Sequence, residues 1–493
     1  MVVSSKMGNL ISHSRAPLFE QCMTFVERDG APFYSPGHKG GRTFPASFRD
    51  RIAALDLNNL PDTDTLHCPT SGILDAQTLL ADAYGARHSF FLVGGSTSGN
   101  IAAMLSALSP GDEILVQRNA HKSVIAGIVH VGAVPVWLAP SLDEDFGLAL
   151  GLAADKVDAA FTAHPKARAL FVLSPTYFGT VPDLAALAEV CRRHGRLLLV
   201  DQAHGAHFHF HPELPVAAED IGADAVVQSI HKTLSGLSQA AVLHLCTDRL
   251  DVARVQEVLQ LLQTTSPSFP VMASIDLARR ELALDGERLL TEALGLARRA
   301  RAELAAIAGV VVLGPERTTG ARSGFFALDE TKITIRVDGV TGYEVQRLLN
   351  EQHGVQPELG GTSHVLFILT IGNTDRDVDR MVAGVRAIAA SRQATPSRDA
   401  SPAPHAWALR AVQPDVVMTP REAFYARAQT VDFFAAEGRV CAEVVTPYPP
   451  GIPVLMPGER ITRALLDELA RVREARCPIS ASDPTLVKMR VVA

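Results

Sequence analysis

Seven short runs rich in β-forming residues alternate with helix-length segments between about residues 75 and 245. The runs are Ser89–Val93, Ile114–Val116, Val134–Leu138, Ala169–Leu173, Arg196–Val200, Ala225–Val227 and Ala241–Leu245. Strands separated by helices predict βαβ units and a mostly parallel sheet. In such open α/β sheets, ligands bind just beyond the carboxyl ends of the strands. We therefore expect a large α/β domain whose functional residues follow its strands.

Two of these runs are followed by side chains suited to chemistry. Lys232 comes after Ala225–Val227, and Asp201 comes directly after Arg196–Val200. Pyridoxal phosphate needs both groups, because its aldehyde binds a lysine amine and its ring nitrogen needs an acid partner to stay protonated. A buried carboxylate is costly unless a cation pairs with it, which favours the cofactor site for Asp201. The alternative role of Asp201 is to cap a helix N-terminus.

A third run leads into a glycine-rich segment that suits a phosphate group. The segment Gly94–Asn100 follows Ser89–Val93 and precedes a helical pattern at Ile101–Leu108. Free backbone N–H groups at a helix N-terminus bind anions, and the hydroxyl groups of this segment add further donors. The three strand ends together therefore predict a pyridoxal phosphate site.

Lys232 has one competing interpretation. Ser229 and Lys232 also fit the S-x-x-K signature of serine acyl-transferases, but the S-D-N and K-T-G motifs that accompany it do not occur in the chain. Three of the eight lysines follow a histidine, namely Lys39, Lys122 and Lys232. Because only Lys232 lies at the end of a strand that comes after the Asp201 strand, we predict that it binds the cofactor.

Four histidines close together raise the question of a metal site. They are His204, His207, His209 and His211. Zinc sites need three or four converging ligands, whereas alternating positions on an extended segment face opposite sides. We therefore expect no metal.

Six motifs, in order along the chain, resemble those of the Orn/Lys/Arg decarboxylases, which are fold-type I pyridoxal-phosphate enzymes that act on basic amino acids. The motifs are SPGHKGG (35–41), RNAHKS (118–123), PTYFG (175–179), DQAH (201–204), SIHK (229–232) and TPYPPGIP (446–453). They extend over nearly the whole chain. The resemblance implies an aspartate aminotransferase-like fold and a decarboxylase.

The resemblance also assigns residues to the cofactor. It implies that His121 stacks over the pyridoxal ring and that Thr176 lies near the ring hydroxyl, although a core position is the alternative for His121. His204 belongs to the same cofactor site. The residues on the phosphate side are Ser96, Thr97, Ser98, Ser229 and His231. Ser98 has a second possible role as a helix-capping residue.

Substrate recognition requires a carboxylate for the distal cation of a basic amino acid. The candidates are Asp64 and Glu443, with solvated surface acids as the alternative interpretation of both. The family often has a second acid where this chain has Thr65, and compact members often have glutamate where it has Gln202. These two departures from the family pattern put in doubt which substrate side chain the protein prefers, and they leave the cofactor chemistry intact.

The expected reaction is the decarboxylation of arginine, lysine or ornithine to agmatine, cadaverine or putrescine, in polyamine metabolism. CO2 leaves from Cα, and either Lys232 or His204 returns a proton to that carbon. Aminotransferases and side-chain lyases share fold type I, so a different reaction on another amino acid is one alternative. A non-catalytic member of the family is the other.

The length of 493 residues predicts more than one domain. We expect an N-terminal arm (1–60), a large cofactor-binding domain (61–270), long linking helices with a small α/β domain (271–390), a linker (391–404) and a C-terminal decarboxylase domain (405–493). Many relatives carry an N-terminal wing domain. Because the SPGHKGG motif comes almost at once, we expect that the wing is absent here.

The composition of the chain limits the classes of molecule that it can be expected to bind. The 53 acidic and 46 basic residues give a net charge of −7 without long runs of either sign, so we expect no nucleic-acid binding. No stretch is apolar enough to cross a membrane. The six scattered cysteines contain no C-x-x-C pair and fit a reducing cytoplasm. The resemblance implies a homodimer or a dimer of dimers with shared active sites, in which Thr264–Pro267 contributes across the interface.

Overall fold

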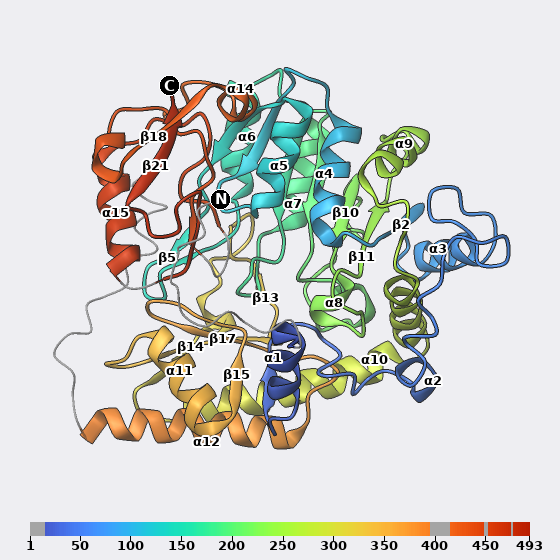
Figure 1. Ribbon diagram of the computed structural model, residues 1–493, viewed down its shortest axis with the longest axis vertical. Helices are drawn as coiled ribbons and strands as arrows, with labels where there is room; N and C mark the ends of the chain where they lie inside the picture. Colours follow the sequence, from blue (N-terminus) through green and yellow to red (C-terminus); the bar gives the residue numbers. More distant parts are fainter. Residues whose placement is uncertain (1–14, 395–414, 448–451, 475–476) are drawn as a thin grey trace.

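A seven-stranded sheet organises the larger part of the chain (Figure 1). The computed structural model describes residues 15–394, 415–447, 452–474 and 477–493. In spatial order the strands are β2 (His88–Leu92), β11 (Ala241–Leu245), β10 (Ala225–Gln228), β9 (Leu197–Asp201), β7 (Ala169–Leu173), β3 (Glu113–Gln117) and β4 (Val134–Leu138). Only β11 runs antiparallel to its neighbours. Each predicted run forms one of these strands, which confirms the mostly parallel sheet.

Both faces of this sheet are covered because its central strands are apolar over most of their length. In β7, Phe171 packs in the core on one face, whereas Leu170 and Val172 pack in the core on the other. The first face carries α4 (Gly95–Ala107), α5 (Lys122–Val131) and α9 (Val252–Leu262), and the second carries α6 (Ala154–Ala163) and α7 (Leu184–Arg193). Burial on both faces is typical of parallel sheets.

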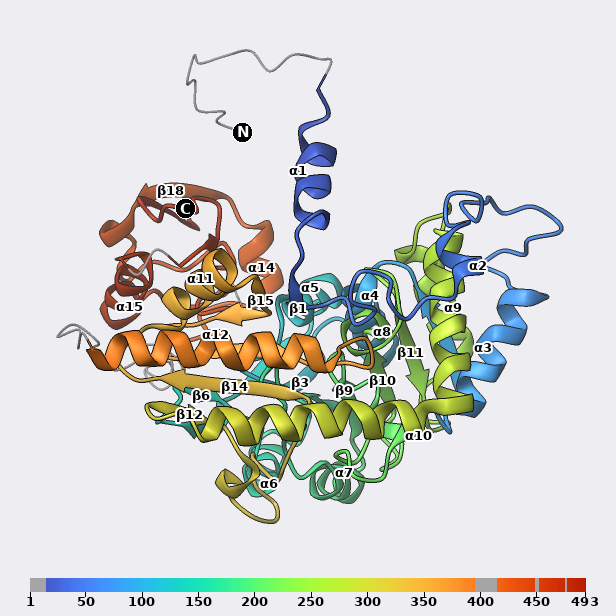
Figure 2. The ribbon, with the colours of Figure 1, turned by 90° about the horizontal axis from the view of Figure 1, so that it is seen from below.

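The region predicted as long linking helices forms one helix, α10 (Phe269–Ala305). Its first half packs beside α3 (Gly72–Ala83), and its second half enters the core of the small unit, where it lies alongside α12 (Asp375–Ala394) (Figure 2). The helix therefore joins two cores in one rigid element. Although α10 has 37 residues, neither it nor any other described helix is long and apolar enough to cross a membrane.

The small unit contains a four-stranded antiparallel sheet. Its strands, in spatial order, are β12 (Val310–Val312), β14 (Lys332–Val337), β17 (Val365–Ile368) and β16 (Leu359–Gly360), covered by α11 (Gly342–His353) and α12. The short strand β1 (Ala31–Phe33) pairs in parallel with β15 (Val355–Pro357). Part of the segment that we expected to be an arm is thus built into the core of the small unit.

The rest of the predicted N-terminal arm contains two helices. It contains α1 (Pro17–Val26) and the short α2 (Ala46–Arg49). In Figure 2, α1 projects away from the body of the molecule, and none of its ten residues, all of them described, is buried.

The remaining elements are short. Around the sheet domain and the small unit lie β5 (Leu142–Asp143), β6 (Leu148–Ala149), β8 (Thr180–Val181), β13 (Ala327–Leu328) and α8 (Ile230–Thr233). The C-terminal unit contains α14 (Pro420–Tyr425), β18 (Ala428–Asp432), β19 (Thr446–Pro447), α15 (Arg463–Glu474), β20 (Ile479–Ser480) and β21 (Lys488–Val492). Most of the predicted linker and residues 448–451 of the TPYPPGIP motif lie outside the described residues.

A buried arginine fastens the C-terminal unit to the sheet domain. Arg118, which follows β3, donates hydrogen bonds to the carbonyl oxygens of Pro453 (2.9 Å) and Val454 (3.0 Å). Its guanidinium also pairs with Glu459 at 3.2 Å, and both side chains are almost fully buried. A buried ion pair needs such additional hydrogen bonds to offset the loss of hydration. The RNAHKS motif thus positions the TPYPPGIP motif beside the carboxyl edge of the sheet.

Candidate active site

The carboxyl ends of β2, β3, β7, β9 and β10 open onto one cavity of about 530 Å³. Eight of the predicted site residues line it: Ser96, Thr97, His121, Thr176, Asp201, His204, His231 and Lys232. They come from segments that are far apart in the sequence and adjacent in the sheet. The structure therefore brings most of the predicted site together at the edge where α/β proteins bind ligands.

Lys232 lies on α8, directly after β10, and its Nζ is 3.0 Å from Nε2 of His204. Burial lowers the pKa of Lys232, and the negative charges of Asp201 and Glu358 act against that shift. Burial and the nearby charge of Lys232 hold the pKa of His204 well below its ordinary value. A neutral His204 therefore accepts a hydrogen bond from the lysine amine, and its Nδ1 has no partner among the described residues.

Asp201 is buried at the end of β9 and is held by two donors. Asn100 Nδ2 donates to Asp201 Oδ2 at 2.8 Å, and the backbone N–H of Ala203 donates to Oδ1 at 3.1 Å. The amide nitrogen must face the carboxylate, because the amide oxygen would repel it. Two hydrogen bonds to different oxygens fix the direction of the carboxylate. Asn100, from the first half of α4, therefore acts on the group predicted to face the ring nitrogen.

The second donor of Asn100 extends the network to His121. Asn100 Nδ2 lies 2.9 Å from Ser123 Oγ, which in turn lies 2.9 Å from His121 Nδ1. The backbone N–H of Ser123 also donates to His121 Nδ1, at 3.2 Å. Because Nδ1 accepts, the ring proton belongs on Nε2. Burial lowers the pKa of His121 to about 4, so this histidine is neutral at physiological pH.

The opposite end of the cavity is formed by the start of α4. Gly94, the N-cap residue, provides no side-chain cap, so first-turn N–H groups of the helix stay available to an anion. Ser96 and Thr97 line this end with their neighbours Ser238 and Gln239. Ser98 does not line the cavity within the described part of the chain, because its hydroxyl donates to the carbonyl oxygen of Gly95 at 2.8 Å.

These features fit pyridoxal phosphate. The cavity contains a lysine amine, a hydrogen-bonded carboxylate and an uncapped helix N-terminus. Two buried polar atoms beside them, His204 Nδ1 and Ser229 Oγ, have no partner among the described residues. Ser229 is fully buried behind the cavity wall. Such atoms are costly unless a ligand or water satisfies them.

The SPGHKGG loop holds the turn that carries Lys232. The backbone N–H of Gly37 donates to the carbonyl oxygen of His231 at 2.7 Å, and Thr370 Oγ1 donates to the carbonyl oxygen of Gly37 at 2.6 Å. A Cβ on Gly37 would lie 2.5 Å from the carbonyl oxygen of Leu234, so only glycine allows this approach. The loop therefore connects α8 to the small unit.

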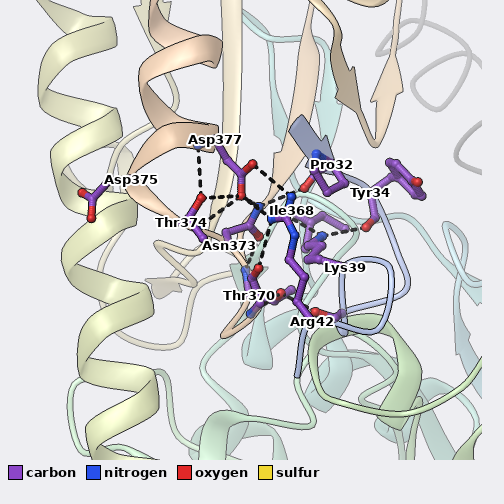
Figure 3. Close-up of polar contacts among 12 residues, drawn as sticks. Pro32, Tyr34, Lys39, Arg42, Ile368, Thr370, Asn373, Thr374, Asp375 and Asp377 are labelled. Atoms are coloured by element: carbon purple, nitrogen blue, oxygen red, sulfur yellow. Dashed lines mark hydrogen bonds and ion pairs between the residues drawn. The ribbon is translucent and has the colours of Figure 1, made fainter. Parts of the chain in front are cut away.

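Two cations of the same loop complete this connection (Figure 3). Buried Lys39 donates from Nζ to the carbonyl oxygens of Tyr34 (2.6 Å) and Ile368 (3.2 Å). Arg42 forms an ion pair with Asp377 at 2.7 Å. Burial lowers the pKa of Lys39 to about 7. Because its Nζ donates to two backbone carbonyl oxygens and Lys39 is not among the described residues that line the cavity, this amine has a structural role.

The predicted substrate acids lie elsewhere within the described chain. Neither Asp64 nor Glu443 lines the cavity among these residues. The carboxylate of Asp64 accepts backbone N–H groups of Thr65, Thr70, Ser71 and Ile73, which fixes the start of α3. The carboxylate of Glu443 accepts the N–H groups of Ser482 and Arg490 in the C-terminal unit. Both acids are buried and satisfied in structural roles, contrary to the expectation that they face a substrate.

Gln202 also points away from the cavity, at least among the described residues. Its amide donates to Glu219 at 2.8 Å and accepts the N–H of Ala218 at 2.7 Å. Burial raises the pKa of Glu219 to about 7. Gln202 therefore hydrogen-bonds to buried polar groups beside the end of β9 and does not face the cavity.

The four clustered histidines contact different parts of the structure. His204 lines the cavity, His207 lies 3.2 Å from Asp329, His209 pairs with Asp220 at 2.7 Å, and His211 contacts Thr291 at 2.9 Å. The described residues contain no group of three or more His, Cys, Asp or Glu side chains arranged to hold a metal ion.

Several residues of the cavity wall were not predicted from the sequence, among them two aromatic residues, an isoleucine and a glutamate. Tyr177 and Phe178 belong to the PTYFG motif, and Ile452 to the TPYPPGIP motif, so their motifs offered a signal. Glu358 reaches the cavity from the small unit, between β15 and β16. No local pattern marks Glu358, because only the packing of the two units brings it to the site.

Comparisons with known proteins agree along the whole chain. Residues 16–377 match the family described as Orn/Lys/Arg decarboxylase, major domain, and residues 405–476 match its C-terminal domain. An arginine decarboxylase of Bacillus subtilis (strain 168) is 38% identical over 490 residues, covering 98% of this chain and 99% of that protein. A lysine decarboxylase of Pseudomonas aeruginosa is 26% identical and covers 98% and 79% of the two chains.

Solved structures agree with the fold. Lysine decarboxylase A of Pseudomonas aeruginosa superimposes with a TM-score of 0.77 at 23% identity, covering 97% of this chain and 80% of the other. The constitutive lysine decarboxylase of Escherichia coli gives a TM-score of 0.74 at 22% identity, covering 97% and 82%. At this identity the likeness establishes the fold, and the activity has to be argued from the family and the site.

The structural role of Asp64 can be tested by its effect on stability. Burial alone would raise the pKa of this carboxyl, but four backbone N–H groups hold it at about 2. Because this is below the ordinary value of about 4, the carboxylate stabilises the fold above that pH, and the contribution is lost as pH falls towards 2. We expect Asp64→Asn to cost about 1–2 kcal/mol at pH 7, and less below pH 4, in thermal unfolding.

Exposed Asp62 provides the matched control, because Asp62→Asn removes a neighbouring charge without a buried acceptor. Equal unfolding temperatures for the Asp64→Asn variant and the wild type at pH 7 would contradict the capping role. A raised KM without loss of stability would return Asp64 to the substrate site.

Proposed function

The chain belongs to the Orn/Lys/Arg decarboxylase family, and from this membership we propose that it removes CO2 from arginine, lysine or ornithine to give agmatine, cadaverine or putrescine. The family also establishes the predicted fold type I, an α/β architecture shared with lysine decarboxylases of known structure. Arginine is the first substrate to test, because the relatives at 34–38% identity include four arginine decarboxylases. Its product would enter polyamine metabolism.

The observation that carries this proposal is the convergence of Lys232, Asp201 and the start of α4 on one cavity. Lys232 would hold the cofactor aldehyde, Asp201 the ring nitrogen, and Ser96 and Thr97 the phosphate. Pyridoxal phosphate, when bound, supplies an electrophilic carbon for the substrate amine and a ring that takes up the electrons left when CO2 departs. The chain supplies orientation, charge and protons.

Each residue around the ring has a distinct task in this proposal. Asn100 fixes the direction of the Asp201 carboxylate, so that it can hold a proton on the ring nitrogen. His121, neutral and fixed by Ser123, forms one wall of the ring site without adding a second cation. Thr176 lines the side where the ring hydroxyl would lie.

Lys232 and His204 are the proposed proton carriers. Their nitrogen atoms are 3.0 Å apart, so a proton that the substrate ammonium gives up when its amine reacts can be held by this pair and can pass from one nitrogen to the other. After substrate binding releases Lys232, the pair is placed to return a proton to Cα. The buried position of His204 keeps bulk water from competing for that step.

We also propose a homodimer, or a dimer of dimers, with shared sites in the cytoplasm. Leu18 and Val26 of α1 are 74% and 72% exposed, so the helix presents apolar residues that the described residues do not cover. Residues Thr264 and Thr265 are held through their carbonyl oxygens by His67 and Asn59 beside a groove of about 630 Å³. We propose that a second copy covers both surfaces and that Thr264–Pro267 contributes to its neighbour's site.

Product analysis tests the reaction. The wild-type protein, loaded with pyridoxal phosphate, is incubated separately with arginine, lysine and ornithine, and the products are identified by mass spectrometry. We expect an amine lighter by CO2 from one of the three, and no amine from the Lys232→Ala variant. A wild-type protein that retains the cofactor but forms none of these amines would contradict the proposed substrate class.

Sedimentation equilibrium tests the assembly. The full chain should have at least twice the monomer mass of 52.7 kDa. Leu18→Ser combined with Val26→Ser should weaken association, because burying apolar area supplies about 25 cal/mol per Å². A wild-type protein that sediments as a monomer at micromolar concentration would refute the dimer.

A further inference from the structure

A buried carboxylate behind the cavity joins the ends of β9 and β10. Glu219 lies in the turn that precedes β10, and its side chain is buried. Its Oε2 accepts a hydrogen bond from the side-chain amide of Gln202 at 2.8 Å, and its Oε1 accepts one from the amide of Gln228 at 3.0 Å. Both glutamines are fully buried. One carboxylate therefore links the residue that follows β9 to the last residue of β10.

Neighbouring groups fix the direction of the hydrogen bonds around Glu219. Gln202 Oε1 accepts the backbone N–H of Ala218 at 2.7 Å, so the amide nitrogen of Gln202 must face the carboxylate. Gln228 Oε1 lies 3.3 Å from Nε2 of His244. Burial lowers the pKa of His244 to about 3, so this ring is neutral and donates its one proton to Gln228. Both oxygens of Glu219 therefore act as acceptors, one for each glutamine.

The two glutamines are next to residues that face the proposed cofactor. Asp201 directly precedes Gln202, and Lys232 comes shortly after Gln228 in the SIHK motif. The backbone N–H of Gln202 also donates to a carbonyl oxygen of β10, at 2.8 Å. Neither glutamine lines the cavity within the described part of the chain, and the same holds for Glu219. These three side chains can therefore act on a ligand only through the residues that they hold in place.

A buried polar cluster of this kind is not the usual way to stabilise a core. Glu219 forms no ion pair with a described residue, since its neighbour Asp220 pairs with His209. Apolar side chains of similar volume often stabilise a core as well as buried charged groups do. Polar networks whose members all have partners instead specify one arrangement of the residues around them. The location of this cluster directly behind the cavity indicates that it orients the site.

We propose that Glu219 is a positioning residue for the cofactor site. Through Gln202 it holds Asp201 at the place of the ring nitrogen, and through Gln228 it holds the turn that carries Lys232. This inference rests on the proposed function, because it assigns the support of the same cofactor site. It predicts that the pattern of hydrogen bonds matters, whichever of positions 202 and 219 carries the carboxylate.

The first variant removes the two acceptors. Glu219→Met keeps the length of the side chain and leaves both glutamine amides without an acceptor. In the full protein, we expect the dissociation constant of pyridoxal phosphate, followed by its visible absorbance, to rise roughly tenfold. We expect kcat to fall roughly 10- to 100-fold, because a displacement of about 1 Å can cost a factor of about 100. KM should change less than about twofold, since none of these side chains lines the cavity.

The second variant exchanges the carboxylate and the amide. In Gln202→Glu combined with Glu219→Gln, the carboxylate at position 202 accepts the N–H of Ala218 and the new amide at position 219, whose oxygen accepts the amide of Gln228. Every hydrogen bond and the net charge are retained. The cofactor dissociation constant and kcat should therefore stay within about twofold of the wild-type values.

Two further variants serve as comparisons. Asp64→Asn removes the cap of α3, away from the cavity, and should lower the unfolding temperature without changing the cofactor dissociation constant. Gln228→Met removes only one of the two donors to Glu219. It should weaken cofactor binding in the same direction by a smaller factor, and it replaces Glu219→Met if that variant does not fold.

Cofactor binding separates this inference from the proposed function. It can be measured even if none of the three amino acids reacts, a result that would count against the proposed function alone. The inference is wrong if the Glu219→Met variant binds pyridoxal phosphate as tightly as the wild type, or if the exchanged pair binds it no better than Glu219→Met. Equal weakening in the Asp64→Asn variant would attribute the loss to general stability and would also overturn it.

Discussion

The parallel pairing of β9 with β10 is the interaction on which the site depends. Val227 lies opposite Asp201 in this register, so the lysine-bearing turn and the carboxylate leave the sheet at the same edge. A slip of one residue would turn Asp201 to the other face of the sheet. The apolar residues of both strands resist that slip, because Leu199 and Val227 pack in the core on one face while Val200 and Val226 pack in the core on the other.

The buried charged groups at the carboxyl edge of the sheet need hydrogen-bond or ion-pair partners close by. Asn100 bonds to Asp201 and Ser123, and Ser123 bonds to His121, so one amide sets the direction of three neighbours. Outside the cavity, Arg118 with Glu459 and Arg42 with Asp377 attach the C-terminal and small units to the same region. The polar interactions of the chain thus assemble the cavity wall. An apolar cluster also joins the two units, because Phe178 packs with Leu359 and Ile368.

Much of the fold and of the candidate site followed from the sequence, because both depend on local patterns. Apolar runs predicted the strands, Asp201 comes at the end of one of them, and Lys232 lies on the short helix α8 that follows another. What escaped prediction depends on contacts distant in sequence: Glu358 meets Ser35 across 323 residues, and β1 pairs with β15. Asp64 was predicted to bind the substrate, because an acid among polar residues can either bind a ligand or cap a helix. Only the fold shows the four backbone N–H groups that its carboxylate accepts.

The most direct test of this account is to locate the bound cofactor chemically. The protein loaded with pyridoxal phosphate is treated with borohydride, which makes the link to lysine permanent, and is then digested and mapped by mass spectrometry. The account predicts the pyridoxyl group on the peptide that contains Lys232, and none on those that contain Lys39 or Lys332. Labelling of another lysine, or no labelling at all, would contradict the convergence of strand ends on a single cofactor site.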